Sequence, residues 1–157
     1  MKKPILLIVD DDEQVLRAVV RDVRTAYGKD YRIISTASAN EALASLTDLK
    51  NKGEVVAMFL SDQRMPDMLG VDFLQKARLI FPNAKRVLLT AYSDTEAAIR
   101  AINDVQLDYY LMKPWDRRKR NCFRRLPIYS IHGRVITRRH SMVFASLDTN
   151  GRRGRTM

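Results

Sequence analysis

Short apolar runs alternate with amphipathic segments along residues 1–115, and this alternation limits the folds that the chain can adopt. Between the apolar runs, apolar residues recur at helical spacing, as at Val15, Val19 and Val23. Repeated strand–helix units predict an α/β fold with a doubly wound, five-stranded parallel sheet. The predicted strands cover residues 4–9, 31–36, 55–60, 86–90 and 109–112.

Polar residues stand where four of these runs end. In a doubly wound sheet, a ligand site lies beyond the carboxyl ends of the strands, so we expect these side chains to share one pocket. The residues are Asp10, Asp11 and Asp12 after the first run, Asp62 after the third, Thr90 after the fourth and Lys113 after the fifth.

The carboxylates in this set predict a magnesium site. Clustered carboxylates repel one another unless a cation neutralises them, and Mg²⁺ prefers oxygen ligands in octahedral geometry. Two of the acids after the first strand, together with Asp62, would supply ligands, and the backbone carbonyl of Arg64 would supply another. Asp12 stands just before a helical segment, which favours a capping role over metal binding.

The same set predicts phosphoryl transfer. A carboxylate can act as the nucleophile and form an acyl phosphate, and we expect Asp62 to do so. The cation and Lys113 would offset the charge of the transferring group. Thr90 would donate a hydrogen bond to a phosphoryl oxygen.

The second predicted helix follows the strand at residues 31–36. It has two candidate N-terminal caps, Ser38 and Asn40.

Four strings within this pattern resemble the response-regulator receiver family of two-component signalling, whose fold is flavodoxin-like. They occur in order and with family-like spacings over 115 residues. Trp115 departs from the family, which usually has Phe after the Lys-Pro pair. The strings are Ile-Val-Asp-Asp-Asp at 8–12, Leu-Ser-Asp-Gln-Arg-Met-Pro-Asp-Met-Leu-Gly at 60–70, Leu-Leu-Thr-Ala at 88–91 and Tyr-Leu-Met-Lys-Pro-Trp at 110–115.

The resemblance implies a role for each matching residue. It assigns Asp10 and Asp11 to the acidic pair that binds magnesium, and Asp62 to phosphorylation. It assigns Thr90 and Tyr110 to a switch pair, in which Tyr110 follows Thr90 toward the phosphoryl group. It assigns Lys113 to the lysine that contacts the phosphoryl group.

The resemblance also implies partners. A sensor histidine kinase or a phosphotransfer protein would donate phosphate to Asp62. The chain would be a switch that assists its own phosphorylation and dephosphorylation, not a dedicated enzyme. A homodimer through the face of the fourth helix and fifth strand is one arrangement that the family allows.

Cysteine usage and hydropathy indicate the compartment. Cys122 is the one cysteine and cannot form an internal disulfide, which favours a reducing cytoplasm. The longest apolar runs are too short to span a membrane, and the first residues lack the pattern of a signal peptide. We therefore expect a cytoplasmic protein without a membrane partner.

Charge divides the chain near Asp116. Residues 1–116 hold 16 Lys and Arg and 17 acids, whereas residues 117–157 hold 12 Lys and Arg and a single acid, Asp148. Apolar spacing after Asp116 is poor for a core-facing helix, so the family's last helix is predicted to be missing or replaced. We expect a receiver domain at 1–116 and an Arg-rich tail at 117–157 that is too short and too charged for an independent domain.

The tail has two interpretations. Its arginines would favour phosphate backbones, which suits a regulator that binds nucleic acid, although helix-turn-helix, zinc-ligand and RNA-binding motifs are not recognisable. Alternatively, the tail is an out-of-frame translation after the Asp116 codon. One permitted restored reading begins with an acidic amphipathic segment. Its end resembles the junction to an FAD-dependent pyridine-nucleotide disulfide reductase-like module, so the chain would be the sensory part of a flavin oxidoreductase fusion.

Overall fold

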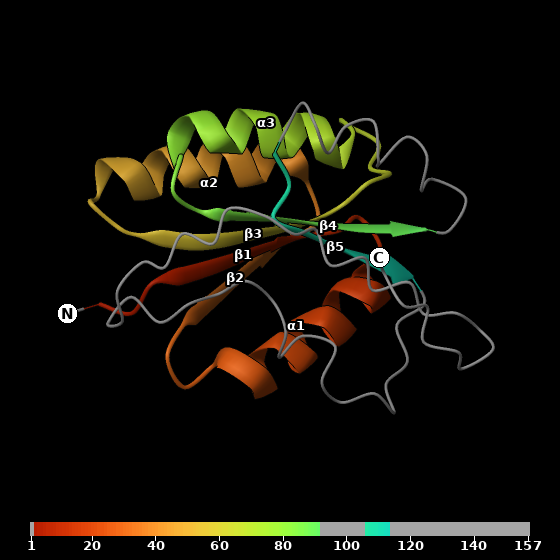
Figure 1. Ribbon diagram of the computed structural model, residues 1–157, viewed down its shortest axis with the longest axis horizontal. Coiled ribbons are helices and arrows are strands. Elements are labelled where there is room, and N and C mark those ends of the chain that lie inside the picture. The colour runs from red at the N-terminus through yellow and green to blue at the C-terminus, as the bar shows by residue number, and fades with distance from the viewer. Residues whose placement is uncertain (1, 92–105, 114–157) are drawn as a thin grey trace, which may run out of the picture.

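A parallel sheet with helices on both faces forms the described part of the molecule (Figure 1). The structure is a computed structural model, and it describes residues 2–91 and 106–113. The elements, in chain order, are β1 (Ile5–Val9), α1 (Glu13–Tyr27), β2 (Arg32–Thr36), α2 (Ala39–Asn51), β3 (Val56–Asp62), α3 (Gly70–Ile80), β4 (Lys85–Ala91) and β5 (Tyr109–Lys113).

The five strands lie in the order β2-β1-β3-β4-β5, and every pairing is parallel. This confirms the predicted doubly wound, five-stranded sheet. All five residues of β1 are buried, which explains why that run is continuously apolar. β2 lies at an edge, and its residues are only partly buried or exposed.

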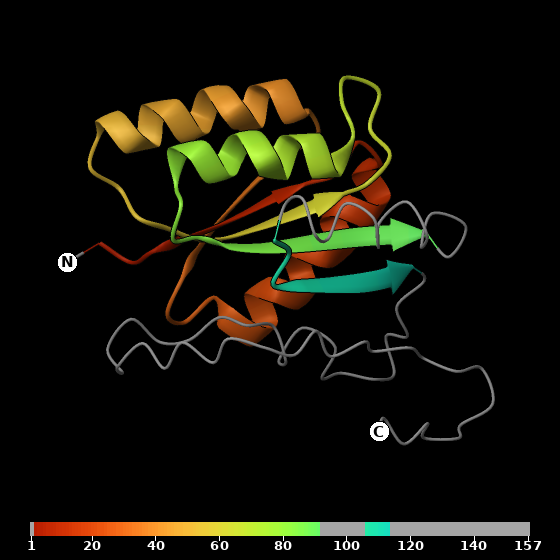
Figure 2. The same cartoon turned by 45° about the horizontal axis from the view of Figure 1, so that its top comes forward.

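Each face of the sheet carries its own apolar core. Helices α2 and α3 cover one face and α1 covers the other (Figures 1 and 2). On the first face, Phe59 packs edge-to-face against Phe73, with ring centroids 6.3 Å apart. On the second face, Val19 and Val23 of α1 pack over Leu6 and Leu60. The helical spacing of apolar residues therefore predicted the buried side of α1 correctly.

Capping residues fix where the first two helices begin. Asp12 accepts hydrogen bonds from the backbone amides of Gln14 (3.0 Å) and Val15 (3.2 Å) at the start of α1. Ser38 caps α2 by accepting from the Glu41 amide at 3.3 Å. The cap residue of α3, Leu69, offers no side-chain acceptor.

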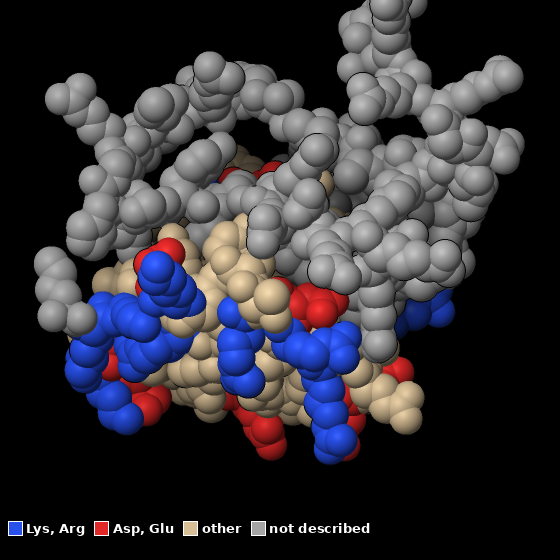
Figure 3. Space-filling view, turned by 90° about the horizontal axis from the view of Figure 1, so that it is seen from below, with Lys and Arg blue, Asp and Glu red and all other residues tan. Residues whose placement is uncertain are grey.

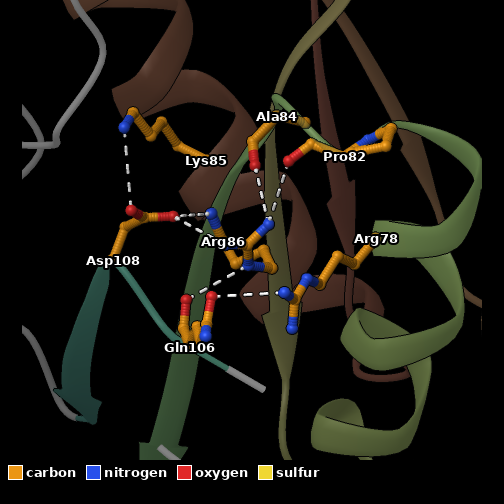
Figure 4. Close-up of polar contacts among 7 residues, drawn as sticks. All are labelled: Arg78, Pro82, Ala84, Lys85, Arg86, Gln106 and Asp108. Carbon is orange, nitrogen blue, oxygen red and sulfur yellow. Dashed lines mark hydrogen bonds and ion pairs between the residues drawn. The ribbon is translucent and has the colours of Figure 1, made fainter. Parts of the chain in front are cut away.

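A polar network joins the amino ends of β4 and β5 (Figure 4). Asp108 accepts a hydrogen bond from the Arg86 amide at 2.8 Å and lies 3.9 Å from its guanidinium group. The Arg86 side chain also donates to the carbonyls of Gln106, Pro82 and Ala84. Burial lowers the pKa of Arg86, and the negative charge of Asp108 opposes that shift. The network lies at the amino ends of the strands, whereas the predicted site lies at their carboxyl ends.

Several predictions fall on residues outside the described ranges. They are the fourth helix around residues 97–102, the aromatic position Trp115 and the whole tail, 117–157. Among the described helices, none has the length and apolar character needed to cross a bilayer.

Candidate functional site

Three carboxylates meet at the carboxyl ends of the neighbouring strands β1 and β3. Val9 pairs with Ser61, so Asp10 and Asp62 are the next residues along adjacent strands. Carboxylate oxygens of Asp10, Asp11 and Asp62 all lie within 4.8 Å of one another. Asp10 is 1% exposed and Asp62 7%, whereas Asp11 is exposed. The structure therefore brings together the three acids that the sequence assigned to the metal.

Asp12 lies beside this group but has a different role. Its carboxylate accepts the two amide hydrogen bonds that cap α1, and its own amide donates to Asp10 Oδ1 at 3.0 Å. This confirms the prediction that Asp12 is a cap. The amide of Asp12 also orients the Asp10 carboxylate, so the start of α1 positions one of the clustered acids.

Thr90 lies next to the acidic group and is fully buried near the end of β4. Asp62 pairs with Leu89, which makes Thr90 the following residue on the neighbouring strand. On β5, Tyr110 pairs with Leu88 and Lys113 pairs with Ala91. The backbone thus puts both β5 residues in register with β4. Their side chains lie outside the described part of the chain.

The acidic group fits a hard divalent cation. Two of its three carboxylates are almost completely buried, and charged groups at such positions are costly unless they are paired or bound to a metal. The ligand atoms are all oxygens, which Mg²⁺ prefers over softer ligands. Arg64, whose carbonyl was predicted as a further ligand, is two residues beyond Asp62 in the connection to α3.

The connection from β3 to α3 contains residues that the sequence did not single out. Gln63 is 4% exposed, and its Oε1 accepts from the amide of Val71 at 3.2 Å. Asp67 accepts from the Ser38 hydroxyl at 3.0 Å and from the Asn40 amide at 2.9 Å. The one sequence signal that could have indicated Gln63 is the apolar residue Leu69 at the cap position of α3.

A basic groove lies away from the acidic group, on the face that carries α1. Lys and Arg side chains are spread across that face (Figure 3). Arg17, Arg21 and Arg24 line the groove, and acids partly neutralise it. Glu13 is 3.9 Å from Arg17, and Asp22 is 3.4 Å from Arg21. Such exposed pairs contribute little to stability.

Comparison with known proteins identifies the family. The family described as "Response regulator receiver domain" matches residues 6–120. The chain belongs to the response regulator receiver family. Receiver domains are phosphoacceptor switches of two-component signalling and not dedicated enzymes, so the predicted class of function is confirmed.

One curated relative and two solved structures illustrate the match. The hydrogenase transcriptional regulatory protein HoxA of Cupriavidus necator is 32% identical over 114 residues, which is 73% of this chain and 22% of that protein. An uncharacterized protein from Neptuniibacter caesariensis is 30% identical with a TM-score of 0.64, over 76% of this chain and 84% of that one.

The second structure is the signal receiver domain of an HD domain-containing protein from Pseudomonas fluorescens Pf-5. It is 27% identical with a TM-score of 0.63, and the match covers 75% of this receiver and 81% of that chain. The receiver thus spans about a fifth of HoxA, and its likeness to HoxA concerns that part alone. These matches leave the flavin-reductase interpretation of the tail untested.

Proposed function

We propose that Asp62 is the phosphoacceptor of this receiver and that Mg²⁺ binds beside it. Asp10, Asp11 and Asp62 would hold the ion through their carboxylates, and Arg64 through its backbone carbonyl. The observation that carries the proposal is the meeting of the three carboxylates within 4.8 Å at the ends of β1 and β3. When bound, the ion supplies positive charge that lowers repulsion between Asp62 and an incoming phosphoryl group.

The transfer itself needs little from the protein beyond position and charge. An Asp62 carboxylate oxygen attacks the phosphorus of a phosphohistidine on the partner, and a P–O bond forms as the P–N bond breaks. The imidazole nitrogen keeps the electron pair of the broken bond and leaves with the partner. Lys113, at the end of β5, would balance the charge of the new acyl phosphate, and Thr90 would donate a hydrogen bond to it.

We further propose that Thr90 and Tyr110 form the switch. Phosphorylation replaces the single charge of the Asp62 carboxylate with a phosphoryl group of about two negative charges beside a buried hydroxyl, which draws Thr90 toward the phosphoryl group. Tyr110 would then occupy the space that Thr90 leaves, and the surface around β5 would change. Thr90 is fully buried, so a movement of its side chain must also shift the residues packed against it.

The partners follow from this chemistry. The phosphodonor would be a sensor histidine kinase or a phosphotransfer protein, and the cytoplasm is the natural compartment for both. A homodimer through the β5 face would be one form of output. Nucleic-acid binding by the eleven arginines of residues 117–157 remains a second candidate, carried by charge alone. Binding to DNA that weakens steeply with salt would support it, and salt-independent behaviour would contradict it.

The phosphoacceptor is tested with the full chain, Mg²⁺ and a small-molecule phosphodonor such as phosphoramidate. Mass spectrometry should find one labile phosphoryl adduct in the wild type and none in Asp62→Asn. Asp48→Asn is the matched control, because it removes an exposed carboxylate on α2 that forms an ion pair with Lys52, just beyond the end of that helix. Labelling of Asp62→Asn at the wild-type level would overturn the assignment.

A further inference from the structure

The connection between β3 and α3, residues 63–69, carries the one backbone ligand of the proposed magnesium site. A carbonyl binds an ion more tightly when the surrounding chain already holds it in place, because less ordering is then needed on binding. Figure 2 shows this connection, in yellow to yellow-green, rising beside the start of α2. Its contacts therefore determine how well the carbonyl of Arg64 is placed before any ion binds.

Gln63 attaches the beginning of the connection to α3. Its backbone amide donates to the Leu89 carbonyl at 3.0 Å, which continues the pairing of β3 with β4. Its backbone carbonyl accepts from the Gly70 amide at 2.8 Å, and its side-chain Oε1 accepts from the Val71 amide at 3.2 Å. The first turn of a helix has amides without partners inside the helix, and Leu69 cannot satisfy them. Gln63 therefore acts as the cap of α3 from outside the helix.

Asp67 attaches the middle of the connection to α2. Its Oδ2 accepts from the Asn40 amide at 2.9 Å and from the Ser38 hydroxyl at 3.0 Å. Ser38 is itself the cap of α2, so Asp67 adds a second acceptor at the same helix end. A negative charge is favoured there because helix amides point toward it. These bonds lower the pKa of Asp67, the Asn40 amide being the largest cause.

Arg64 lies between these two attachment points. Met65, the next residue, is 8% exposed and packs in the core under α2 and α3. Residues 63, 65 and 67 are thus each fixed by burial or by hydrogen bonds, whereas Arg64 itself is exposed. Fixed neighbours on both sides leave the Arg64 peptide little freedom.

We infer that Gln63 and Asp67 are positioning residues, which hold the β3–α3 connection so that the Arg64 carbonyl is preorganised for a divalent cation. The inference rests on the proposed function, and it adds two residues that touch neither the ion nor the phosphoryl group. Loss of such supporting contacts weakens metal binding by roughly tenfold or more in other sites. A change of about tenfold in Mg²⁺ affinity is therefore expected for each residue.

The test measures the Mg²⁺ dissociation constant of the full chain by calorimetry. Gln63→Met keeps the length of the side chain but removes the acceptor, and Asp67→Ala removes the second attachment. Both should bind Mg²⁺ about tenfold more weakly. Asp67→Asn keeps an acceptor for the Asn40 amide and should recover most of the loss. Amide hydrogen exchange without Mg²⁺ should be faster around residues 63–71 in the two weakened variants.

The matched control is Asp108→Ala. Asp108 also accepts a hydrogen bond from a backbone amide, that of Arg86, but at the amino ends of the strands and away from the acidic group. This control should lower the urea midpoint at least as much as the positioning variants while leaving Mg²⁺ affinity unchanged. If Asp108→Ala does not fold, Asp108→Asn serves in its place. Equal weakening in the control would overturn the inference, because destabilisation alone would then explain the effect.

Failure of this inference can be told apart from failure of the proposed function. If the wild type does not bind Mg²⁺, or if Asp11→Asn binds it as tightly as the wild type, the proposed magnesium site and the positioning role are both contradicted. If Asp11→Asn loses binding while Gln63→Met and Asp67→Ala match the wild type, only the positioning role falls. An Asp67→Asn variant as weak as Asp67→Ala would also count against that role.

Discussion

Gly70 begins α3 directly against the backbone carbonyl of Asp62. A β-carbon on Gly70 would be 2.1 Å from that oxygen and 2.9 Å from a methyl carbon of Leu88. The first turn of α3 is thus packed on the peptide that carries the proposed phosphoacceptor. Any side chain at position 70 must push the helix away from β3 or distort the strand.

Gly70→Ala should therefore destabilise the fold and disturb the site together. Overpacking of this kind costs about 1–3 kcal/mol, which urea unfolding would measure. Phosphorylation of Asp62 should slow even at temperatures where the variant is folded. Gly53→Ala is a useful control: its backbone has a φ of 71°, but no atom lies within 4 Å of the added carbon. It should cost stability of about 1 kcal/mol and leave phosphorylation unchanged.

Asp11 and Asp12 should respond differently to substitution. Asp11→Ala removes a carboxylate of the acidic group and should strongly weaken Mg²⁺ binding in a calorimetric titration. Asp12→Ala removes the cap of α1 and should cost about 1 kcal/mol of stability, with a much smaller effect on Mg²⁺. A greater loss of Mg²⁺ affinity in Asp12→Ala than in Asp11→Ala would show that the ligands are wrongly assigned.

The acidic group could be predicted from sequence because it depends on strand ends. Asp10 and Asp62 each follow an apolar run, and parallel topology alone brings such positions together. The helix caps could also be predicted from sequence, because Asp12 and Ser38 stand directly before the helices that they cap. Of the two candidate caps for α2, Ser38 is the one that caps the helix, while the backbone amide of Asn40 donates a hydrogen bond to Asp67.

Gln63 and Asp67 could not be found by this reasoning, because their partners are distant in sequence. Gln63 caps α3 by accepting a hydrogen bond from a backbone amide eight residues later in the sequence. Asp67 accepts a hydrogen bond from Ser38, which is 29 residues away in the sequence. Local capping patterns extend over only three or four residues. Such contacts depend on how α2, α3 and the end of β3 are packed, which no single stretch of sequence encodes.

The Arg86–Asp108 pair should be more important for stability than an ordinary surface ion pair. The Arg86 side chain is only 9% exposed and that of Asp108 24%, so loss of either partner leaves the other poorly solvated. Asp108→Ala should cost about 3 kcal/mol in urea unfolding. Asp48→Ala, which breaks the exposed pair with Lys52, should cost far less than Asp108→Ala. Similar losses in the two variants would contradict this prediction.

Asp67 should make the fold sensitive to acid. Its pKa is held below the ordinary value of 3.8 by the Asn40 amide and the Ser38 hydroxyl, so the folded state favours the carboxylate. A carboxyl with a lowered folded pKa contributes stability that is fully present above its unfolded pKa and lost as pH falls through the folded pKa.

The comparison for Asp67 is urea unfolding of the wild type and Asp67→Asn between neutral pH and strong acid. The wild type should be the more stable above about pH 4, near the unfolded pKa of aspartate. The difference should shrink as the pH falls below that value, because the wild-type carboxylate becomes protonated. Asp22→Asn provides the matched control, since Asp22 lies on α1, 3.4 Å from the exposed Arg21 side chain and away from the start of α2. A stability difference between wild type and Asp67→Asn that stays constant down to strong acid would show that the charge of Asp67 does not support the start of α2.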